Sequence, residues 1–409
     1  MSVRIAAIRI LDQVLSSAVK ASVAMAGAQC DEKDRRLLHE LVYGVLRRFY
    51  SLEADYSRYC KAKPDTLTQA ALLLGSYQIR HMRIPTHAAV SETVTAINKL
   101  HPKAKGFTNA VLRRVAASEL PKRLKPHQRV ELPKWLYAGW RDAFGAEAVQ
   151  EFSKHLQQTP SLCLAVFEDR DAWMKKAQLM GIDSEAGVLS PYAVLLKSGT
   201  DVTSLPGYED GSFTVMDQAA QAAVMALNVK QADGLILDLC AAPGGKTILL
   251  SKRFPKASIV AVEMNEKRLP RLLENIERLG CHNVSIIRGD AANLPFTDRS
   301  VDGVLLDAPC SASGILRRHP DAKFLHDQDE VKKLASLQHE LLQEALRVTK
   351  ENAALVYAVC SIHPEENEQI VSGFSGLKSE RLFPSNSHDG FFFATINKPD
   401  ALAKGAASQ

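Results

Sequence analysis

Two cysteines that follow predicted strands are the residues of this chain best suited to chemistry. Cys310 comes shortly after the apolar run 301–306, and Cys360 comes after the run 353–358. A single buried cysteine is usually a small apolar side chain. Two thiols at the carboxyl ends of neighbouring strands are a rarer arrangement, which indicates nucleophilic catalysis by a thiolate. Asp307 adds a carboxylate to the same predicted edge.

A glycine turn and two acidic residues, each after a predicted strand, indicate a nucleoside site. The turn 242–245 (APGG) follows a buried apolar run and lets the backbone approach a ligand. Glu263, after the run 259–262, can accept both hydrogen bonds of a ribose diol. Asp290, after the next such run, suits the amine of an adenine. In this order, the three features predict a site for S-adenosylmethionine.

Two other nucleotide-binding classes are excluded by the same turn. A phosphate loop of the G-x-x-x-x-G-K-[ST] type requires glycine where Cys240 stands. The G-x-G-x-x-G fingerprint of dinucleotide enzymes is missing as well. The chain is therefore read neither as an NTPase nor as an NAD-type dehydrogenase.

A methyl donor beside two thiols predicts methylation of carbon 5 of a pyrimidine. That carbon attacks a sulfonium methyl only after a thiolate adds to carbon 6, and a base must later remove the carbon 5 proton. Asp307 at ring N3 would stabilise the adduct and favour cytosine. Lys246 or His363 could supply the positive charge that lowers a thiol pKa. Residue order alone does not rank Cys310 and Cys360.

Three regions are expected to position these residues. Residues 1–120 carry apolar side chains at helical spacing, which predicts an all-helical unit, and the Pro-rich, basic stretch 121–133 predicts a linker. Residues 134–215 predict a small α+β region, and the alternation after residue 216 predicts a doubly wound α/β sheet. The expected strands cover 162–167, 188–196, 235–239, 259–262, 284–287, 301–306, 353–358 and 391–393, with a helix near 173–180.

The charge of the chain is unevenly distributed. Residues 1–130 hold 22 Lys and Arg against 10 Asp and Glu, a net charge of +12, whereas the remainder has 29 against 36, a net charge of −7. Within residues 80–129, eleven basic side chains face only Glu92 and Glu119. This asymmetry indicates a surface for a polyanion such as RNA, although a solvated helical face is the alternative.

The composition is that of an ordinary globular protein of two to three domains. The 409 residues are 46% apolar and 24% charged, and no apolar run approaches the roughly 18 residues of a membrane helix. Arg4, Arg9 and Asp12 interrupt any secretory signal. Seven cysteines without a C-x-x-C pair indicate a reducing cytosol, no disulfide framework and no zinc site. We expect a cytoplasmic monomer that binds no membrane and no metal.

Three motifs resemble those of the NOL1/NOP2/Sun family of RNA cytosine-5 methyltransferases. They are residues 237–247 (LDLCAAPGGKT), residues 307–314 (DAPCSASG) with 317–321 (RRHPD), and Cys360-Ser361 with 364–367 (PEEN). Residues 83–93 (RIPTHAAVSET) and 105–113 (KGFTNAVLR) resemble the NusB-like RNA-binding domain of the bacterial RsmB (Sun) branch. The resemblance covers nearly the whole chain.

The resemblance implies a role for each motif. Cys360 would be the nucleophile, Cys310 would assist proton removal or product release, and the substrate would be one cytosine of 16S (small-subunit) ribosomal RNA. It divides the chain into a NusB-like helical RNA-binding domain (1–125), an α+β RNA-positioning region (134–215) and a catalytic domain with a Rossmann-like fold (216–397). The implied S-adenosylmethionine site comprises Cys240, Ala241, Ala242, Pro243, Gly244, Gly245 and Lys246, with Glu263, Asp290 and Asp307.

The chain departs from the family pattern at a few positions. Val359 stands where Thr is usual, Glu263 replaces Asp, Phe324 replaces Trp, and the strand 162–167 lacks the usual Arg and Asn. Residues 317–319 (RRH) directly follow the Asp307 loop and are expected to position RNA phosphate. The same reaction on another RNA, such as transfer RNA, and a non-catalytic RNA-binding scaffold are the alternatives.

Overall fold

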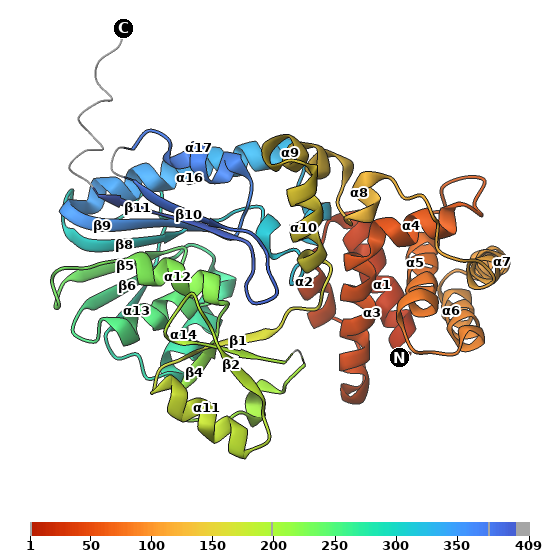
Figure 1. Ribbon diagram of the computed structural model, residues 1–409, viewed down its shortest axis with the longest axis horizontal. Coiled ribbons are helices and arrows are strands. Elements are labelled where there is room, and N and C mark those ends of the chain that lie inside the picture. The colour runs from red at the N-terminus through yellow and green to blue at the C-terminus, as the bar shows by residue number, and fades with distance from the viewer. Residues whose placement is uncertain (1, 198, 375–376, 398–409) are drawn as a thin grey trace, which may run out of the picture. The chain divides into compact units, whose positions relative to one another are not determined.

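The chain divides into two compact units, which are described separately. A computed structural model describes residues 2–197, 199–374 and 377–397 (Figure 1). One unit comprises Met1–Gln158 with Leu316–Gln328, and the other comprises Thr159–Ile315 with Asp329–Gln409. Within the described ranges, no helix has the length and apolar character needed to cross a membrane. The division at residues 1–125, 134–215 and 216–397 remains a prediction from sequence.

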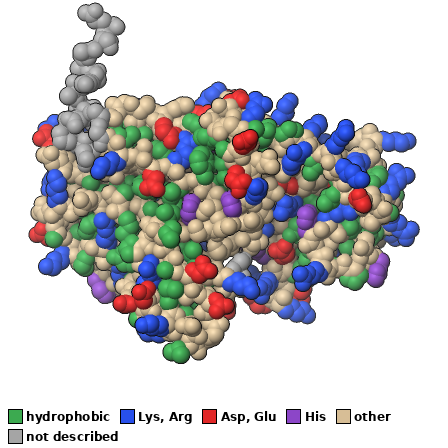
Figure 2. Space-filling view, in the orientation of Figure 1, with side chains coloured by type: hydrophobic (Ala, Val, Ile, Leu, Met, Phe, Trp, Pro, Cys, Tyr) green, Lys and Arg blue, Asp and Glu red, His purple; other side chains and the backbone are tan. Residues whose placement is uncertain are grey.

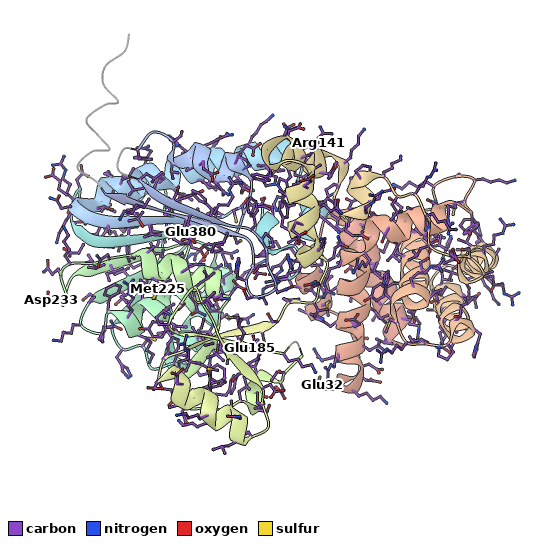
Figure 3. All side chains as sticks on the ribbon, viewed as in Figure 1. Glu32, Arg141, Glu185, Met225, Asp233 and Glu380 are labelled. Atoms are coloured by element: carbon purple, nitrogen blue, oxygen red, sulfur yellow. The ribbon has the colours of Figure 1, made fainter. Side chains whose placement is uncertain are left out.

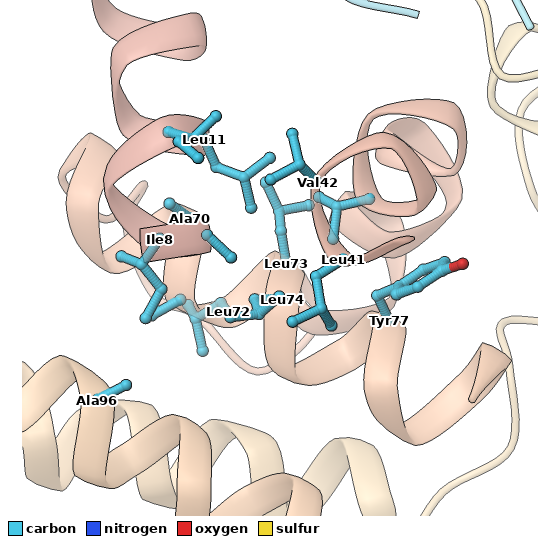
Figure 4. Close-up of a cluster of buried hydrophobic side chains, with 14 of the residues drawn as sticks. Ile8, Leu11, Leu41, Val42, Ala70, Leu72, Leu73, Leu74, Tyr77 and Ala96 are labelled. Carbon is cyan, nitrogen blue, oxygen red and sulfur yellow. The ribbon is translucent and has the colours of Figure 1, made fainter. Parts of the chain in front are cut away.

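The first unit is helical, as predicted. Its core contains Ile8 and Leu11, which pack with Leu41, Leu73 and other apolar side chains of the cluster in Figure 4, as the helical spacing predicted. These side chains recur at helical spacing, so each helix turns one apolar face inward. The helices are α1 (Val3–Ser17), α2 (Ala21–Ala26), α3 (Arg35–Arg47), α4 (Phe49–Ser57), α5 (Thr66–His81), α6 (Thr86–Leu100), α7 (Lys105–Ala116), α8 (Pro126–Arg129), α9 (Lys134–Phe144), α10 (Ala146–Leu156) and α15 (Ala322–Leu325), with 3-10 turns at Glu32–Asp34 and Pro102–Ala104.

Two segments of this unit differ from the sequence expectation. Residues 121–133 are not a free linker, because α8 lies within them and Val130 and Leu132 are buried. Residues 134–156, which we expected to begin the α+β region, form α9 and α10 and belong to the helical unit. Their buried faces include Trp140, Val149 and Phe152.

A short segment that follows the Asp307 loop is built into the helical unit. Residues 316–328 pass among its helices, where Phe324 packs edge-on against Phe49 with ring centroids 4.8 Å apart. The Asp321 carboxylate accepts a hydrogen bond from the backbone N–H of Ala21 (3.0 Å). The ammonium of Lys323 is buried and donates to the carbonyl oxygen of Glu131 (3.0 Å). The segment is thus held by an aromatic contact and two buried polar contacts.

The second unit begins with a small α+β layer. Its antiparallel sheet has the order β2-β3-β1-β4, and α11 (Arg170–Leu179) covers it with the buried Trp173. The strands are β1 (Leu162–Val166), β2 (Ser184–Ala186), β3 (Ala193–Leu196) and β4 (Phe213–Val215), with a 3-10 turn at Val202–Ser204. The expected strand 188–196 is shorter because only its last four residues pair with β1.

The rest of the second unit is the predicted doubly wound sheet, in the order β10-β11-β9-β8-β5-β6-β7. Strands β7, β6, β5, β8 and β9 are parallel, and β11 and β10 add antiparallel pairs at one edge. The strands are β5 (Leu235–Leu239), β6 (Ser258–Glu263), β7 (Val284–Arg288), β8 (Val301–Asp307), β9 (Thr349–Val359), β10 (Lys378–Leu382) and β11 (Phe391–Asn397). The helices are α12 (Gln218–Ala226), α13 (Gly245–Arg253), α14 (Leu269–Arg278), α16 (Gln328–Val348) and α17 (Glu368–Val371), with 3-10 turns at Glu266–Arg268, Ser313–Ile315 and Pro364–Glu366.

Helices cover both faces of this sheet because successive strand residues point to opposite sides. Leu237 of β5 packs in a cluster with Leu341 of α16, whereas its neighbour Ile236 packs with Leu249 of α13. The chain order reverses between β5 and β8, which are adjacent in the sheet. In open α/β sheets, ligands bind at the carboxyl ends of the strands beside such a reversal.

Candidate active site

The glycine turn after β5 is fixed by a buried carboxyl group. Thr247 of α13 donates its hydroxyl to Asp238 Oδ2 of β5 (2.5 Å). Burial raises the pKa of Asp238 to about 7. Between these two residues Gly244 has φ +103°, and a Cβ there would lie 2.7 Å from Leu272 Cδ1. Only glycine fits this turn, which brings backbone N–H groups of the α13 N-terminus to the sheet edge.

Glu263 lies at the end of β6, beside that turn. It is 5% exposed, and its carboxylate accepts hydrogen bonds from the backbone N–H groups of Ala242 (3.2 Å) and Asn265 (2.9 Å). Arg268 approaches the same carboxylate to 3.3 Å. Asp290 follows β7, is exposed, and accepts from the backbone N–H of Ala292 (2.9 Å). The structure thus brings Glu263 against the predicted turn and leaves Asp290 open to solvent.

Lys246 and Asp307 form an ion pair that joins α13 to the end of β8. Lys246 Nζ donates to Asp307 Oδ2 at 2.7 Å. Burial alone lowers the pKa of Lys246, but the charges and hydrogen bond of Asp307, and the Cys360 thiolate, reverse this and raise it. Lys246 is therefore held as a cation beside Asp307, and its charge interacts with the Cys360 thiol group.

The two thiols meet at the ends of β8 and β9. Cys310 Sγ and Cys360 Sγ are 3.2 Å apart, and the strands that carry them pair directly, with Asp307 opposite Ala358. The hydrogen bond with Cys360, followed by burial, raises the pKa of Cys310 well above its ordinary value. Either sulfur can be the donor of this contact. The structure thus brings both predicted thiols together.

The turn and the acids of the sheet edge fit S-adenosylmethionine. Each oxygen of the Glu263 carboxylate accepts one backbone N–H and Arg268 lies beside Oε2, and because a carboxylate has about four acceptor positions, it retains capacity to accept from a ribose hydroxyl. The exposed Asp290 can accept from an adenine amine. Gly244 removes the side chain that would otherwise crowd the turn. The donor and acceptor set therefore matches the predicted cofactor.

The structure shows two buried acidic residues that the sequence analysis did not single out, and it buries one arginine that was expected to contact RNA. Sequence reasoning assigned no role to Asp238 or Glu366, although a charged residue inside the apolar run 235–239 was a usable signal for the first. Arg317, expected to position RNA phosphate, is 1% exposed, and its backbone carbonyl oxygen accepts a hydrogen bond from Arg47 Nε (3.2 Å) inside the helical unit. Arg318 is half-buried and His319 is exposed.

The cations of residues 80–129 lie on the surface of the helical unit, with one exception. Arg80 is paired with the buried Asp55 (2.7 Å) and is structural. We define the basic surface as the ten other cations, all of which are exposed: Arg83, Lys99, Lys103, Lys105, Arg113, Arg114, Lys122, Arg123, Lys125 and Arg129. Figure 2 shows Lys and Arg side chains gathered over the helices of this unit. Acidic side chains of the second unit, such as Glu185, Asp233 and Glu380, are labelled in Figure 3.

The sheet order, the glycine turn and the acids at the strand ends define the class of S-adenosylmethionine-dependent methyltransferases with a Rossmann-like fold. A family model described as 16S rRNA methyltransferase RsmB/F matches residues 224–389, and a NusB family model matches residues 1–117.

Two relatives match along nearly the whole chain. Proteins named ribosomal RNA small subunit methyltransferase B from Photorhabdus laumondii and Vibrio vulnificus are 34% and 36% identical to this chain. The first match covers 95% of this chain and 96% of the relative, and the second covers 97% and 100%. The chain therefore belongs to the RsmB (Sun) branch of the NOL1/NOP2/Sun family, as its motifs predicted, and S-adenosylmethionine is the cofactor of this class.

Solved structures support the fold. The crystal structure of PH0851 superposes with a TM-score of 0.80 at 21% identity and covers 97% of this chain and 99% of that chain. A methyltransferase homologue from Pyrococcus horikoshii has a TM-score of 0.59 at 24% identity and covers 67% of this chain and 97% of that chain.

Proposed function

We propose that this protein transfers a methyl group to carbon 5 of one cytosine in small-subunit (16S) ribosomal RNA, through a covalent bond between Cys360 and the base. The observation that supports this most is the pair of thiols 3.2 Å apart beside the Lys246–Asp307 ion pair. Relatives that match along the whole chain bear the name of a small-subunit ribosomal RNA methyltransferase, which supports the choice of RNA.

The reaction begins at Cys360. Its thiolate, near the Lys246 cation, adds to carbon 6 of the cytosine and makes carbon 5 nucleophilic. Asp307, held by Lys246, faces ring N3 and the exocyclic amine and stabilises the charge of the adduct. Bound S-adenosylmethionine supplies the electrophilic methyl group.

Cys310 completes the reaction. The hydrogen bond with Cys360, burial and the charge of Cys360 raise the pKa of Cys310, and formation of the C–S bond removes Cys360 as that partner. Cys310 then loses its proton to solvent more readily, and its thiolate removes the proton from carbon 5. The freed electron pair re-forms the ring double bond, and the C–S pair returns to Cys360. One proton is released overall, which balances the transfer of a cationic methyl group.

The basic surface is the proposed contact for the RNA backbone, because cations clustered on one unit neutralise phosphate without reading sequence. Seven free cysteines and an RNA substrate support a cytoplasmic location. The proposed catalytic residues are Cys360, Cys310 and Asp307, and the proposed cofactor site is the segment 240–246 with Glu263 and Asp290.

The substrate is tested by supplying labelled S-adenosylmethionine with unmodified small-subunit ribosomal RNA or with transfer RNA, and digesting the product to nucleosides. We expect 5-methylcytidine from the ribosomal RNA only. Methylation of transfer RNA alone would keep the chemistry and reject the substrate, and labelling of a nucleoside other than 5-methylcytidine would reject the chemistry.

A further inference from the structure

The two loops that carry the thiols share one buried carboxylate. Each thiol is followed by a serine, Ser311 in one loop and Ser361 in the other. Glu366 has no exposed surface, and its Oε2 accepts from both serine hydroxyls at 2.5 Å. Its Oε1 accepts from the backbone N–H of Ser311 (2.8 Å) and from Gln338 Nε2 of α16 (3.0 Å). The carboxylate therefore bridges the residues next to Cys310 and Cys360.

We propose that Glu366 is a positioning residue that holds Cys310 and Cys360 in contact, and so sets the geometry of the thiol pair. This inference rests on the proposed function, in which both thiols act on one cytosine. No residue of the cofactor site is involved, and Glu366 itself touches neither sulfur in a hydrogen bond of the described structure.

The acceptor chemistry explains why a carboxylate occupies this place. All four groups around Glu366 are donors, and an ionised carboxyl group only accepts. Among the described residues no Lys or Arg pairs with it, and burial raises the pKa of Glu366. A buried carboxyl group without a cation costs free energy, so its four hydrogen bonds must be satisfied together. The site is consequently rigid rather than adaptable.

Further hydrogen bonds anchor this bridge to the fold. Tyr357 of β9 donates its hydroxyl to the Glu366 carbonyl oxygen (2.6 Å). Gln338 also donates to the carbonyl oxygen of Pro309 (2.9 Å), one residue before Cys310. Displacement of either loop by 1 Å would separate the sulfurs, and a misplacement of that size costs about 100-fold in rate.

The charge and the geometry of Glu366 can be separated by substitution. In Glu366→Gln, the amide oxygen keeps the two N–H donors, and the amide NH2 faces the two serine hydroxyls, which can turn to accept. Glu366→Ala removes all four contacts. The positioning role therefore predicts that the glutamine variant rescues what the alanine variant loses.

The experiment measures the thiol pair directly. Phenylarsine oxide condenses with two adjacent thiols to form two As–S bonds and one water, so its tight one-to-one binding requires contact between the sulfurs. Loss of this binding in Cys310→Ser and in Cys360→Ser identifies the two thiols as the arsenical site. Glu365→Gln, a change at the neighbouring half-exposed carboxylate, is the matched control.

We expect Glu366→Ala to lose at least about tenfold in arsenical affinity and about 100-fold in kcat, with KM for S-adenosylmethionine unchanged. We expect Glu366→Gln and Glu365→Gln to stay within about threefold of wild type. Wild-type arsenical binding by Glu366→Ala would overturn the proposal, and so would a loss in Glu366→Gln equal to that of the alanine variant. If Glu366→Ala does not fold, Ser361→Ala takes its place, and unchanged arsenical binding in that variant overturns the proposal.

This experiment distinguishes a failure of the Glu366 proposal from a failure of the proposed function. Arsenical binding uses no RNA and no methyl donor, so the pattern across variants tests the positioning role alone. Absence of cytosine methylation by wild type, with the arsenical pattern intact, would reject the proposed function and keep the role of Glu366 in the thiol pair.

Discussion

Lys323 and Glu131 are two buried residues of opposite charge that interact electrostatically, and their substitution tests how the helical unit holds residues 316–328. Lys323 Nζ donates to the Glu131 carbonyl oxygen at 3.0 Å and lies 5.2 Å from the Tyr50 ring centroid. The Glu131 carboxylate is buried and accepts from the backbone N–H groups of Tyr50 (2.8 Å) and Ser51 (3.2 Å). Burial, opposed by the charge of Glu131, lowers the pKa of Lys323 to about 8.

The expected magnitude follows from the burial of both charges. Removal of one partner of a buried pair costs about 3–5 kcal/mol, because the other charge stays buried without its counter-charge, whereas replacement of both is often neutral. Lys323→Met and Glu131→Gln should therefore each lower the free energy of unfolding of the helical unit by about 3 kcal/mol. The double variant should lose about 1 kcal/mol or less, instead of the roughly 6 kcal/mol of an additive pair.

Urea unfolding at pH 7 measures this cycle. Tryptophan fluorescence in a Trp173→Phe background reports the helical unit, which contains Trp135 and Trp140. Lys122→Met, at an exposed lysine, is the control and should change stability by less than about 0.5 kcal/mol. A double variant as unstable as the sum of the two single variants would refute the reasoning, since it would show that the charges do not compensate each other.

Three further variants test the cofactor site and the basic surface. Glu263→Ala should weaken S-adenosylmethionine binding about 10- to 100-fold in calorimetry, because hydrogen bonds to a charged group contribute about 1.5–3 kcal/mol; unchanged affinity would remove Glu263 from the site. Burial raises the pKa of Asp238 from 3.8 to about 7, so the carboxyl group ionises at a lower pH in the unfolded chain than in the folded one. The free energy of unfolding of the wild type should therefore decrease as the pH rises from 3.8 to about 7. Urea unfolding across that range should show this decline lost in Asp238→Asn, and an identical decline in both proteins would contradict it. A plot of the logarithm of RNA affinity against the logarithm of salt concentration should become less steep, by about one unit of slope for each of Lys105, Arg113 and Arg114 that contacts RNA and is changed to glutamine. Binding of S-adenosylmethionine should be unaltered, and an unchanged slope would reject this surface as the RNA contact.

Short apolar runs in the sequence predicted most of the sheet, because strands that are buried on both faces consist mainly of apolar residues. The run 235–239 coincides with β5, and Phe391 begins the predicted closing strand β11. The expected strand 188–196 was too long, because Val188 is exposed and Pro191 interrupts it before β3 begins at Ala193. Strand ends depend on pairing partners that a local pattern does not contain.

The sequence of α9 and α10 has helical spacing of apolar residues, but the mixed pattern that follows led us to assign these residues to the α+β region. Leu136 and Trp140 are four residues apart, and Val149 and Phe152 are three apart, which is the spacing of a buried helical face. Their membership of the first unit is a long-range property and could not be predicted from spacing.

The residue types of the candidate site and the sheet edge that carries them were predictable from the sequence, but their pairings were not. Cys310 and Cys360 could be assigned to one sheet edge because parallel strands end on the same side. Their contact, and the ion pair of Lys246 with Asp307, join residues about 50 to 60 positions apart in the chain. Glu366 could not be distinguished from Glu365 by sequence, since only folding buries one and leaves the other half-exposed.

The central claim is that Cys360 attacks the cytosine and Cys310 releases the product, and one parallel measurement tests it. Wild type, Cys360→Ala and Cys310→Ala are each incubated with labelled S-adenosylmethionine and unmodified small-subunit ribosomal RNA, and both 5-methylcytidine and covalent protein–RNA adducts are quantified. We predict 5-methylcytidine from wild type, neither product nor adduct from Cys360→Ala, and a trapped adduct from Cys310→Ala. An adduct formed by Cys360→Ala, or methylation that survives its loss, would contradict the account.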